Sequence, residues 1–410
     1  MIFVNVSLTL TAIVLLSLIL YRYRLSQLLL AGFAIRLVLA LTHAYYAPLP
    51  DTQNDALDFE RVGIGLAHNG FEEAVRNVQP GAYSYAWFIG IVYSVLGTNI
   101  YVIMLINSFV SMLTVIYALR IAQMLAVVRR KHMIWLGLAL CIHPTLALYS
   151  VIPLREAFFT FFFVFAVYNT VVYAETKRFI RLVIAGISIM PGAVLHSSLV
   201  VVYAAVGYVL YRRNRTREIA ARPVVLLLAA AIAGGVLYLM YITNIGFDKL
   251  GLLAHGFDAF YERSADARTA YLTGISIDAW YDYFWQVPLR VVFFLLMPFP
   301  WVVSTAVDAF ACFDALLWGG MLLTLFYCAD FRKADVKTQP VLIALVLMML
   351  VMAMGTPGYG TGIRHRAKIL PIMMVATTAA LSGTLSRKQS ADARHHNSEL
   401  ERWGAAPVLS

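Results

Sequence analysis

The sequence predicts an all-α polytopic membrane protein, with about eleven membrane-spanning helices and two further helices lying at the outer membrane surface. The chain is 61% hydrophobic and only 13% charged, whereas soluble domains carry about 25% charged residues. Apolar runs of roughly twenty residues recur from end to end, which is the length needed to cross the hydrocarbon core of a bilayer. The short alternating segments that are typical of a membrane β-barrel do not occur in the sequence.

Clusters of arginine and lysine predict how these spans are oriented. The net charge of +10 arises at the ends of apolar runs, and basic loops of membrane proteins stay on the cytoplasmic side. The strongest marker is the stretch 212–217 (RRNRTR). Because membrane orientation accounts for the basic charge, it requires no nucleic-acid partner. The spans are predicted at about residues 2–21, 27–46, 100–125, 133–149, 156–174, 180–193, 197–211, 223–243, 309–329, 340–355 and 368–384.

Two apolar runs are predicted not to cross the bilayer, at 81–97 and at 288–301. If they crossed, the basic residues that follow the next span would lie outside, against the positive-inside rule. Residues 1–386 then form one membrane domain, with external loops at 47–99 and 244–308 and with the N-terminus outside. The polar segment 387–410 is predicted to be a disordered cytoplasmic tail.

An acidic stretch follows the second predicted span, on the external side. Asp51, Asp55, Asp58 and Glu60 lie within ten residues of a chain that has few acids. The first three have i, i+4, i+7 spacing, which would place three carboxylates on one face of a helix. The alternative is an ordinary helix start, since Thr52 and Asp55 fit a capping box and acids belong in a first turn.

Other ionisable residues gather on the same predicted side, and no orientation rule explains them. Ionisable groups near the hydrocarbon are costly unless they are paired or line a polar cavity, so they are candidates for function. Each also has a structural alternative: a charge pair at a helix start, a packed and hydrogen-bonded histidine, or an arginine that anchors at the interface. The candidates for substrate binding are Arg155, Glu156, His143, His196, Arg364, His365 and Arg366.

The chemistry that this set favours is group transfer at the outer membrane surface. The sequence has no zinc-binding spacing, phosphate-cradling glycine loop or nucleophile elbow, and it predicts neither a metal nor another cofactor. A carboxylate can deprotonate an acceptor hydroxyl while cations stabilise a departing phosphate. Arginine suits phosphate oxygens because its guanidinium binds them bidentately.

The layout resembles that of the C-type (GT-C) membrane glycosyltransferases, and within them the family 39-like group of protein O-mannosyltransferases and bacterial aminoarabinose–lipid A transferases. The stretch 55–59 (DALDF) looks like their external Asp-Glu-x-x-Tyr motif, with Asp55 as the first acid and Phe59 as the aromatic residue. Ala56 departs from the second acid, whose place would fall to Asp58 or Asp51. Further similarity lies in Arg364-His365-Arg366 before Pro371 and in 154–156 (LRE) combined with 298–301 (PFPW).

The resemblance implies a sugar donor linked to polyprenyl phosphate or diphosphate, and an envelope glycan, lipid or protein acceptor. It implies that Asp55 acts as base or orients the acceptor, with Asp58 and Asp51 as further candidate acids and arginines on the donor phosphate. It places the protein in the bacterial cytoplasmic membrane, among membrane lipids, with its site facing the exterior.

Two other functions remain open from the sequence. A polysaccharide polymerase or ligase acting on lipid-linked oligosaccharide would depend on external arginines and histidines, with Glu156 and His196 more important than Asp55. A transporter or flippase would need ionisable residues paired at mid-span, for which Arg36 is the candidate.

Overall fold

The structure is a computed structural model that describes residues 2–21, 23, 25–79, 81–125, 130–214, 261, 265–275, 281–329 and 334–402. Within these ranges the regular structure is helical throughout, apart from one isolated bridge between Ala270 and Gly358, so the all-α prediction is confirmed there. Five of the described helices are long and apolar enough to cross a membrane. They are α1 (Ile2–Leu20), α2 (Ser26–Tyr45), α6 (Ile100–Leu125), α9 (Glu156–Thr176) and α16 (Ala306–Cys328).

The other described helices are shorter or more polar, and they match most of the remaining predicted segments. The predicted total of spans stays a prediction, because the segment 223–243 lies outside the described residues. These helices are α3 (Asp55–His68), α4 (Phe71–Arg76), α5 (Ser84–Leu96), α7 (Arg130–Ile142), α8 (Pro144–Tyr149), α10 (Phe179–Leu195), α11 (Val202–Asn214), α15 (Asp282–Leu296), α17 (Thr338–Met354) and α18 (Tyr359–Arg402), with 3-10 turns η1 (Gly81–Tyr83), η2 (Ser197–Val201) and η4 (Pro300–Val302).

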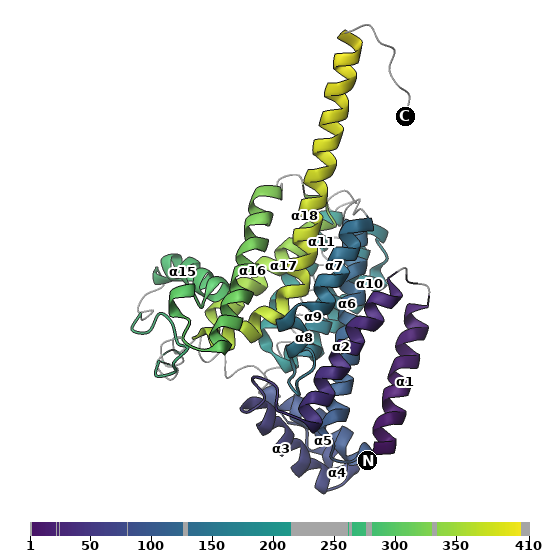
Figure 1. The fold of residues 1–410 in the computed structure, drawn as a ribbon, viewed down its shortest axis with the longest axis vertical. Coiled ribbons are helices and arrows are strands. Elements are labelled where there is room, and N and C mark those ends of the chain that lie inside the picture. Colours follow the sequence, from purple (N-terminus) through teal and green to yellow (C-terminus); the bar gives the residue numbers. More distant parts are fainter. Residues whose placement is uncertain are drawn as a thin grey trace.

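The bundle is built around α6 and α9, which are apolar on every face. In each, 72% of the most apolar 18-residue window is buried, against 22% in α1. A helix that is apolar all round must be buried in protein or face lipid, so α1 lies at the periphery and its exposed Leu10 and Leu18 suit contact with lipid. Figure 1 shows α1 beside α2 at the edge of the bundle, with the N-terminus and α3 to α5 at one end and the far end of α18 at the other.

Helices α3 and α5 form a tightly packed pair at the end that carries the acidic stretch. The apolar face of α3, including Phe59, packs against Tyr85 on α5 with ring centroids 5.8 Å apart. Gly63 on α3 allows this approach, because a Cβ there would lie 2.5 Å from Ile89 Cγ2 and 2.9 Å from Ile89 Cβ. The close contact fixes the position of the first turn of α3.

Replacing Gly63 by alanine is therefore expected to lower the thermal unfolding midpoint in detergent, because a β-branched neighbour must shift. Gly65→Ala is the matched control, since a Cβ at this position meets nothing within 4 Å and alanine favours a helix over glycine by about 1 kcal/mol. Equal midpoints for the two variants would contradict the tight packing of α3 on α5.

Among the boundaries that differ from the sequence predictions, three change how a segment is interpreted. The predicted span 133–149 is interrupted at His143, because Pro144 starts a new helix, α8. The helix expected from about residue 368 begins at Tyr359, so Arg364 and its neighbours lie within α18 rather than in an external turn. The predicted disordered tail is helical as far as Arg402, since 387–402 contains no glycine or proline and several good helix formers.

Candidate functional site

A cleft of about 780 Å³ opens at the end of the molecule that carries α3. Its walls come from the loop before α3, the start of α9, the junction between α10 and η2, and the first turns of α18. Six of the residues predicted from the sequence line it. They are Asp51, Asp55, Arg155, His196, Arg364 and His365.

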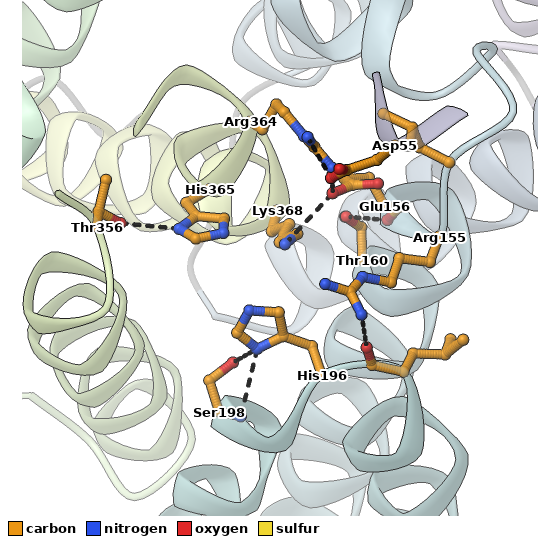
Figure 2. A network of polar contacts seen from close by, with 12 residues as sticks. Asp55, Arg155, Glu156, Thr160, His196, Ser198, Thr356, Arg364, His365 and Lys368 are labelled. Carbon is orange, nitrogen blue, oxygen red and sulfur yellow. Dashed lines mark hydrogen bonds and ion pairs between the residues drawn. The ribbon is translucent and has the colours of Figure 1, made fainter. Parts of the chain in front are cut away.

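Arg364 is the centre of the charged network (Figure 2). Its Nη1 donates to Asp55 Oδ2 at 2.9 Å, and its Nη2 donates to Glu156 Oε1 at 3.1 Å. Its Nε lies 3.6 Å from Asp51 Oδ2. The Arg364 side chain is only 11% exposed, so these three carboxylates hold a largely desolvated cation. The structure thus brings together the acidic stretch and the arginine that the sequence places 309 residues apart.

Lys368 is a member of this network that the sequence reasoning missed. Its fully buried ammonium lies 3.4 Å from the Glu156 Oε1 atom that also accepts from Arg364. In a helix, residues four apart share a face, so Arg364 and Lys368 both reach Glu156. The i, i+4 spacing would have identified Lys368, had the segment been predicted as helical.

Asp51 and Asp55 reach the cleft from different backbone conformations. Asp55 starts α3, whereas Asp51 precedes the helix with a left-handed φ of 60°. The predicted single helical face for three acids is therefore wrong. The capping-box alternative is also wrong, because Asn54 is the N-cap and the Thr52 hydroxyl donates to the Leu49 carbonyl. Burial raises the pKa of Asp51 above its usual range, although the Arg364 guanidinium opposes this shift.

Asp58 does not join the site. Its side chain is 53% exposed and forms an i, i+3 ion pair with Arg61 at 3.2 Å. Although Asp58 shares the first turn of α3 with Asp55, it lies outside the residues that line the cleft.

Arg155 and Glu156 occupy the start of α9. Glu156 is the first residue of the helix, a favourable place for an acid, but its contacts with Arg364 and Lys368 go beyond a simple helix-start pair. The Arg155 Nη1 donates to the Leu195 carbonyl at 2.7 Å, and burial lowers the pKa of its guanidinium. The buried Arg155 Nε has no hydrogen-bond partner among the described residues.

His196 and His365 meet on another wall of the cleft. Their ring centroids lie 5.4 Å apart with the rings nearly perpendicular. Each ring is fixed through Nδ1, by the Ser198 hydroxyl at 2.7 Å for His196 and by the Thr356 hydroxyl at 2.8 Å for His365. Figure 2 shows the two rings pointing toward one another, with Lys368 and Arg155 nearby.

A further ion pair lines the cleft and was not predicted from the sequence. Arg268 binds Asp308 bidentately at 2.8 and 3.0 Å, and the Tyr359 hydroxyl donates to Asp308 at 3.1 Å. Asp308 also completes a capping box with Thr305 at the start of α16. For Asp308 the sequence does offer a signal, the Thr-x-x-Asp spacing from Thr305 to Asp308. This spacing indicates the start of a helix, and it does not indicate that Asp308 lines a cleft.

Arg366 and His143 lie away from the cleft, contrary to prediction. Residues two apart on a helix differ by about 200°, so Arg366 points away from Arg364. It is fully buried, with Nε 2.9 Å from Asp314 Oδ2 and Nη1 donating to the carbonyls of Phe294, Leu295 and Met297. His143 lines a separate apolar groove between α7, α16 and α18.

Arg36 is the residue that the transporter alternative depends on, and its surroundings indicate a structural role. Its guanidinium donates to the hydroxyls of Ser111 and Ser150 and to the carbonyls of Gly32, Leu140 and Cys141. These acceptors satisfy a buried guanidinium and join α2 to the end of α7. A fully buried ion pair, Arg366–Asp314, links α18 to α16.

The described residues contain no group of three or more His, Cys, Asp or Glu side chains that could hold a metal ion. No protein-family model matches the chain, and no match was found among curated proteins or solved structures. The fold and the site therefore define a helical, membrane-embedded class of protein with a charged cleft at one end of its bundle.

Proposed function

We propose that this protein transfers a sugar from a polyprenyl-phosphate-linked donor to an envelope glycan, lipid or protein acceptor. The observation that carries the proposal is the meeting of Asp55 and Arg364 in one cleft, with Arg155 and Lys368 close by. The cleft faces the exterior of a bacterial cytoplasmic membrane. A carboxylate beside a group of cations suits the two events of the reaction, loss of the acceptor proton and departure of a phosphate.

In this proposal Asp55 receives and orients the acceptor hydroxyl, since it is the half-exposed acid of the network. Arg155, Arg364 and Lys368 face the donor phosphate. Arg155 contributes most directly, because its buried Nε lacks a partner among the described residues and a charged donor without an acceptor is costly. Arg366, which the resemblance would place on the phosphate, has a structural role instead.

A neighbouring groove supports a donor with a long apolar tail. It has a volume of about 640 Å³ and is lined mainly by apolar side chains of α7, α16 and α18. Helix α16 contributes Phe310 and Ala311 to the cleft and Phe313 and Leu317 to the groove. A lipid whose phosphate lies in the cleft can therefore extend its tail along α16.

The alternative is a polymerase or ligase that acts on lipid-linked oligosaccharide. The pairing of His196 with His365 favours it, because such an enzyme would rely on histidines and arginines in this cleft. Dependence of transfer on Asp55 separates the two, since the ligase mechanism does not require that carboxylate.

The proposal is tested by incubating the purified protein with a panel of undecaprenyl-phosphate-linked hexoses and pentoses, together with envelope glycans, lipids and proteins as acceptors, and measuring released undecaprenyl phosphate. We expect release from at least one donor, and Arg155→Gln should raise KM for this donor by roughly 10- to 100-fold, as expected for loss of a hydrogen bond to a charged group. Arg178→Gln is the control, because Arg178 is exposed before α10. Absence of release from every donor would overturn the proposal.

A further inference from the structure

The histidine pair in the cleft has a hydrogen-bonding asymmetry that the roles above do not use. His196 belongs to the α10–η2 junction and His365 to α18, and each residue is 8% exposed. Because the environment of each Nδ1 differs, the two neutral rings must carry their hydrogens on different nitrogens.

His196 accepts at Nδ1. The backbone N–H of Ser198 points at this nitrogen from 3.4 Å, and the Ser198 hydroxyl lies 2.7 Å from it. A nitrogen that accepts a backbone N–H carries no hydrogen of its own. The neutral His196 ring therefore carries its hydrogen on Nε2.

His365 donates at Nδ1. The Thr356 hydroxyl has a single hydrogen, which it donates to the Met352 carbonyl at 2.5 Å. Toward His365 Nδ1, 2.8 Å away, the hydroxyl oxygen can therefore only accept. The neutral His365 ring carries its hydrogen on Nδ1, so Nε2 is the nitrogen at which this ring can take up a proton.

The charged groups around this pair balance among the described residues. On the cationic side are Arg155, Arg268, Arg364 and Lys368, and on the anionic side are Asp51, Asp55, Glu156 and Asp308. Four formal charges of each sign leave no excess positive charge to offset the second charge that distinguishes a phosphate monoester from a diester. A proton taken up by a histidine would supply it.

We propose that His365 takes up one proton at Nε2 when a phosphate monoester occupies the cleft, so that both histidines present Nε2–H groups to it. The proposal rests on the proposed function. In the transfer, the bond from C1 of the sugar to the phosphate oxygen breaks and its electron pair stays on the phosphate. The acceptor oxygen bonds to C1 and its proton leaves through Asp55. The phosphate thereby changes from a singly charged diester to a doubly charged monoester, whose second charge the proton on His365, drawn from solvent, balances.

The test measures proton uptake during binding of farnesyl phosphate, a short isoprenyl phosphate monoester, to the full-length protein in detergent. Titration calorimetry at pH 8 in buffers of different ionisation enthalpy gives the number of protons bound. At this pH free imidazole and a free phosphate monoester are both largely deprotonated. We expect uptake of about one proton per ligand by the wild-type protein and little uptake with the methyl diester of farnesyl phosphate.

His365→Gln should abolish the uptake and weaken binding roughly tenfold or more, while His68→Gln, at the exposed end of α3, should leave both unchanged. Thr356→Val is a second variant that keeps the imidazole but removes its hydroxyl acceptor, and it should reduce the uptake. Binding with equal uptake in wild type and His365→Gln would overturn the proton assignment alone. Failure of the wild-type protein to bind farnesyl phosphate would overturn the proposed function together with it.

Discussion

Asp55→Asn is expected to lower the turnover of sugar transfer by roughly 10²- to 10⁴-fold, the range for removal of a positioned acid–base group. The fold should tolerate the change. The Asp55 side chain is 52% exposed, and Arg364 keeps its contacts with Asp51 and Glu156. An asparagine oxygen can still accept from Arg364, but it cannot take a proton from a hydroxyl. The expected result is therefore lost turnover with an unchanged unfolding midpoint, measured on one detergent preparation.

Asp58→Asn is the matched control, because the two acids share the first turn of α3 and only Asp55 lines the cleft. Turnover of this variant should equal that of the wild-type protein. Full activity of Asp55→Asn, combined with loss of activity in Glu156→Gln and His196→Gln, would favour the polymerase or ligase instead.

Arg366→Met should destabilise the protein by about 3–5 kcal/mol, the usual cost of removing one partner of a buried ion pair. It would leave Asp314, which is 1% exposed, with the Thr145 hydroxyl but without its cation. It would also remove the donor that satisfies three carbonyls at the end of α15. The measurement is the free energy of unfolding in mixed detergent micelles, followed by helical circular dichroism.

The double variant Arg366→Met/Asp314→Leu should recover part of this loss, because it removes the unpaired buried carboxylate. Arg61→Met, which breaks the exposed pair with Asp58, should cost no more than about 1 kcal/mol. A double variant that is no more stable than Arg366→Met would show that the carboxylate is not the source of the destabilisation.

The sequence predicted the apolar helices well, because a run such as 100–125 needs no knowledge of its neighbours. The prediction ends at Leu125, as α6 does. It failed at Tyr359–Ala367, where glycines and basic residues resemble an external turn. The helix forms there because tertiary contacts satisfy those basic residues: Arg364 on the cleft acids and Arg366 on Asp314 and the carbonyls of α15. These partners lie far away in the sequence.

One part of the site was predicted from the sequence, namely that ionisable residues from distant segments gather on one side of the membrane. The sequence placed Asp55 and Arg364 on one side, and the structure joins them. It could not separate Arg364 from Arg366, because that requires knowing that the segment is helical. It also gave no signal for Arg268, whose partner Asp308 belongs to the first turn of α16.

The stretch of α18 from Arg364 to Lys368 contacts two different sets of partners, on opposite faces of the helix. Arg364 and Lys368 face the acids of the cleft, while Arg366 between them is clamped to α15 and α16. Inserting a single residue ahead of Arg364 would rotate everything beyond it by about 100° and misdirect both sets of contacts at once. The position of the cleft cations therefore depends on the same helix register as the buried contacts of Arg366 with α15 and α16.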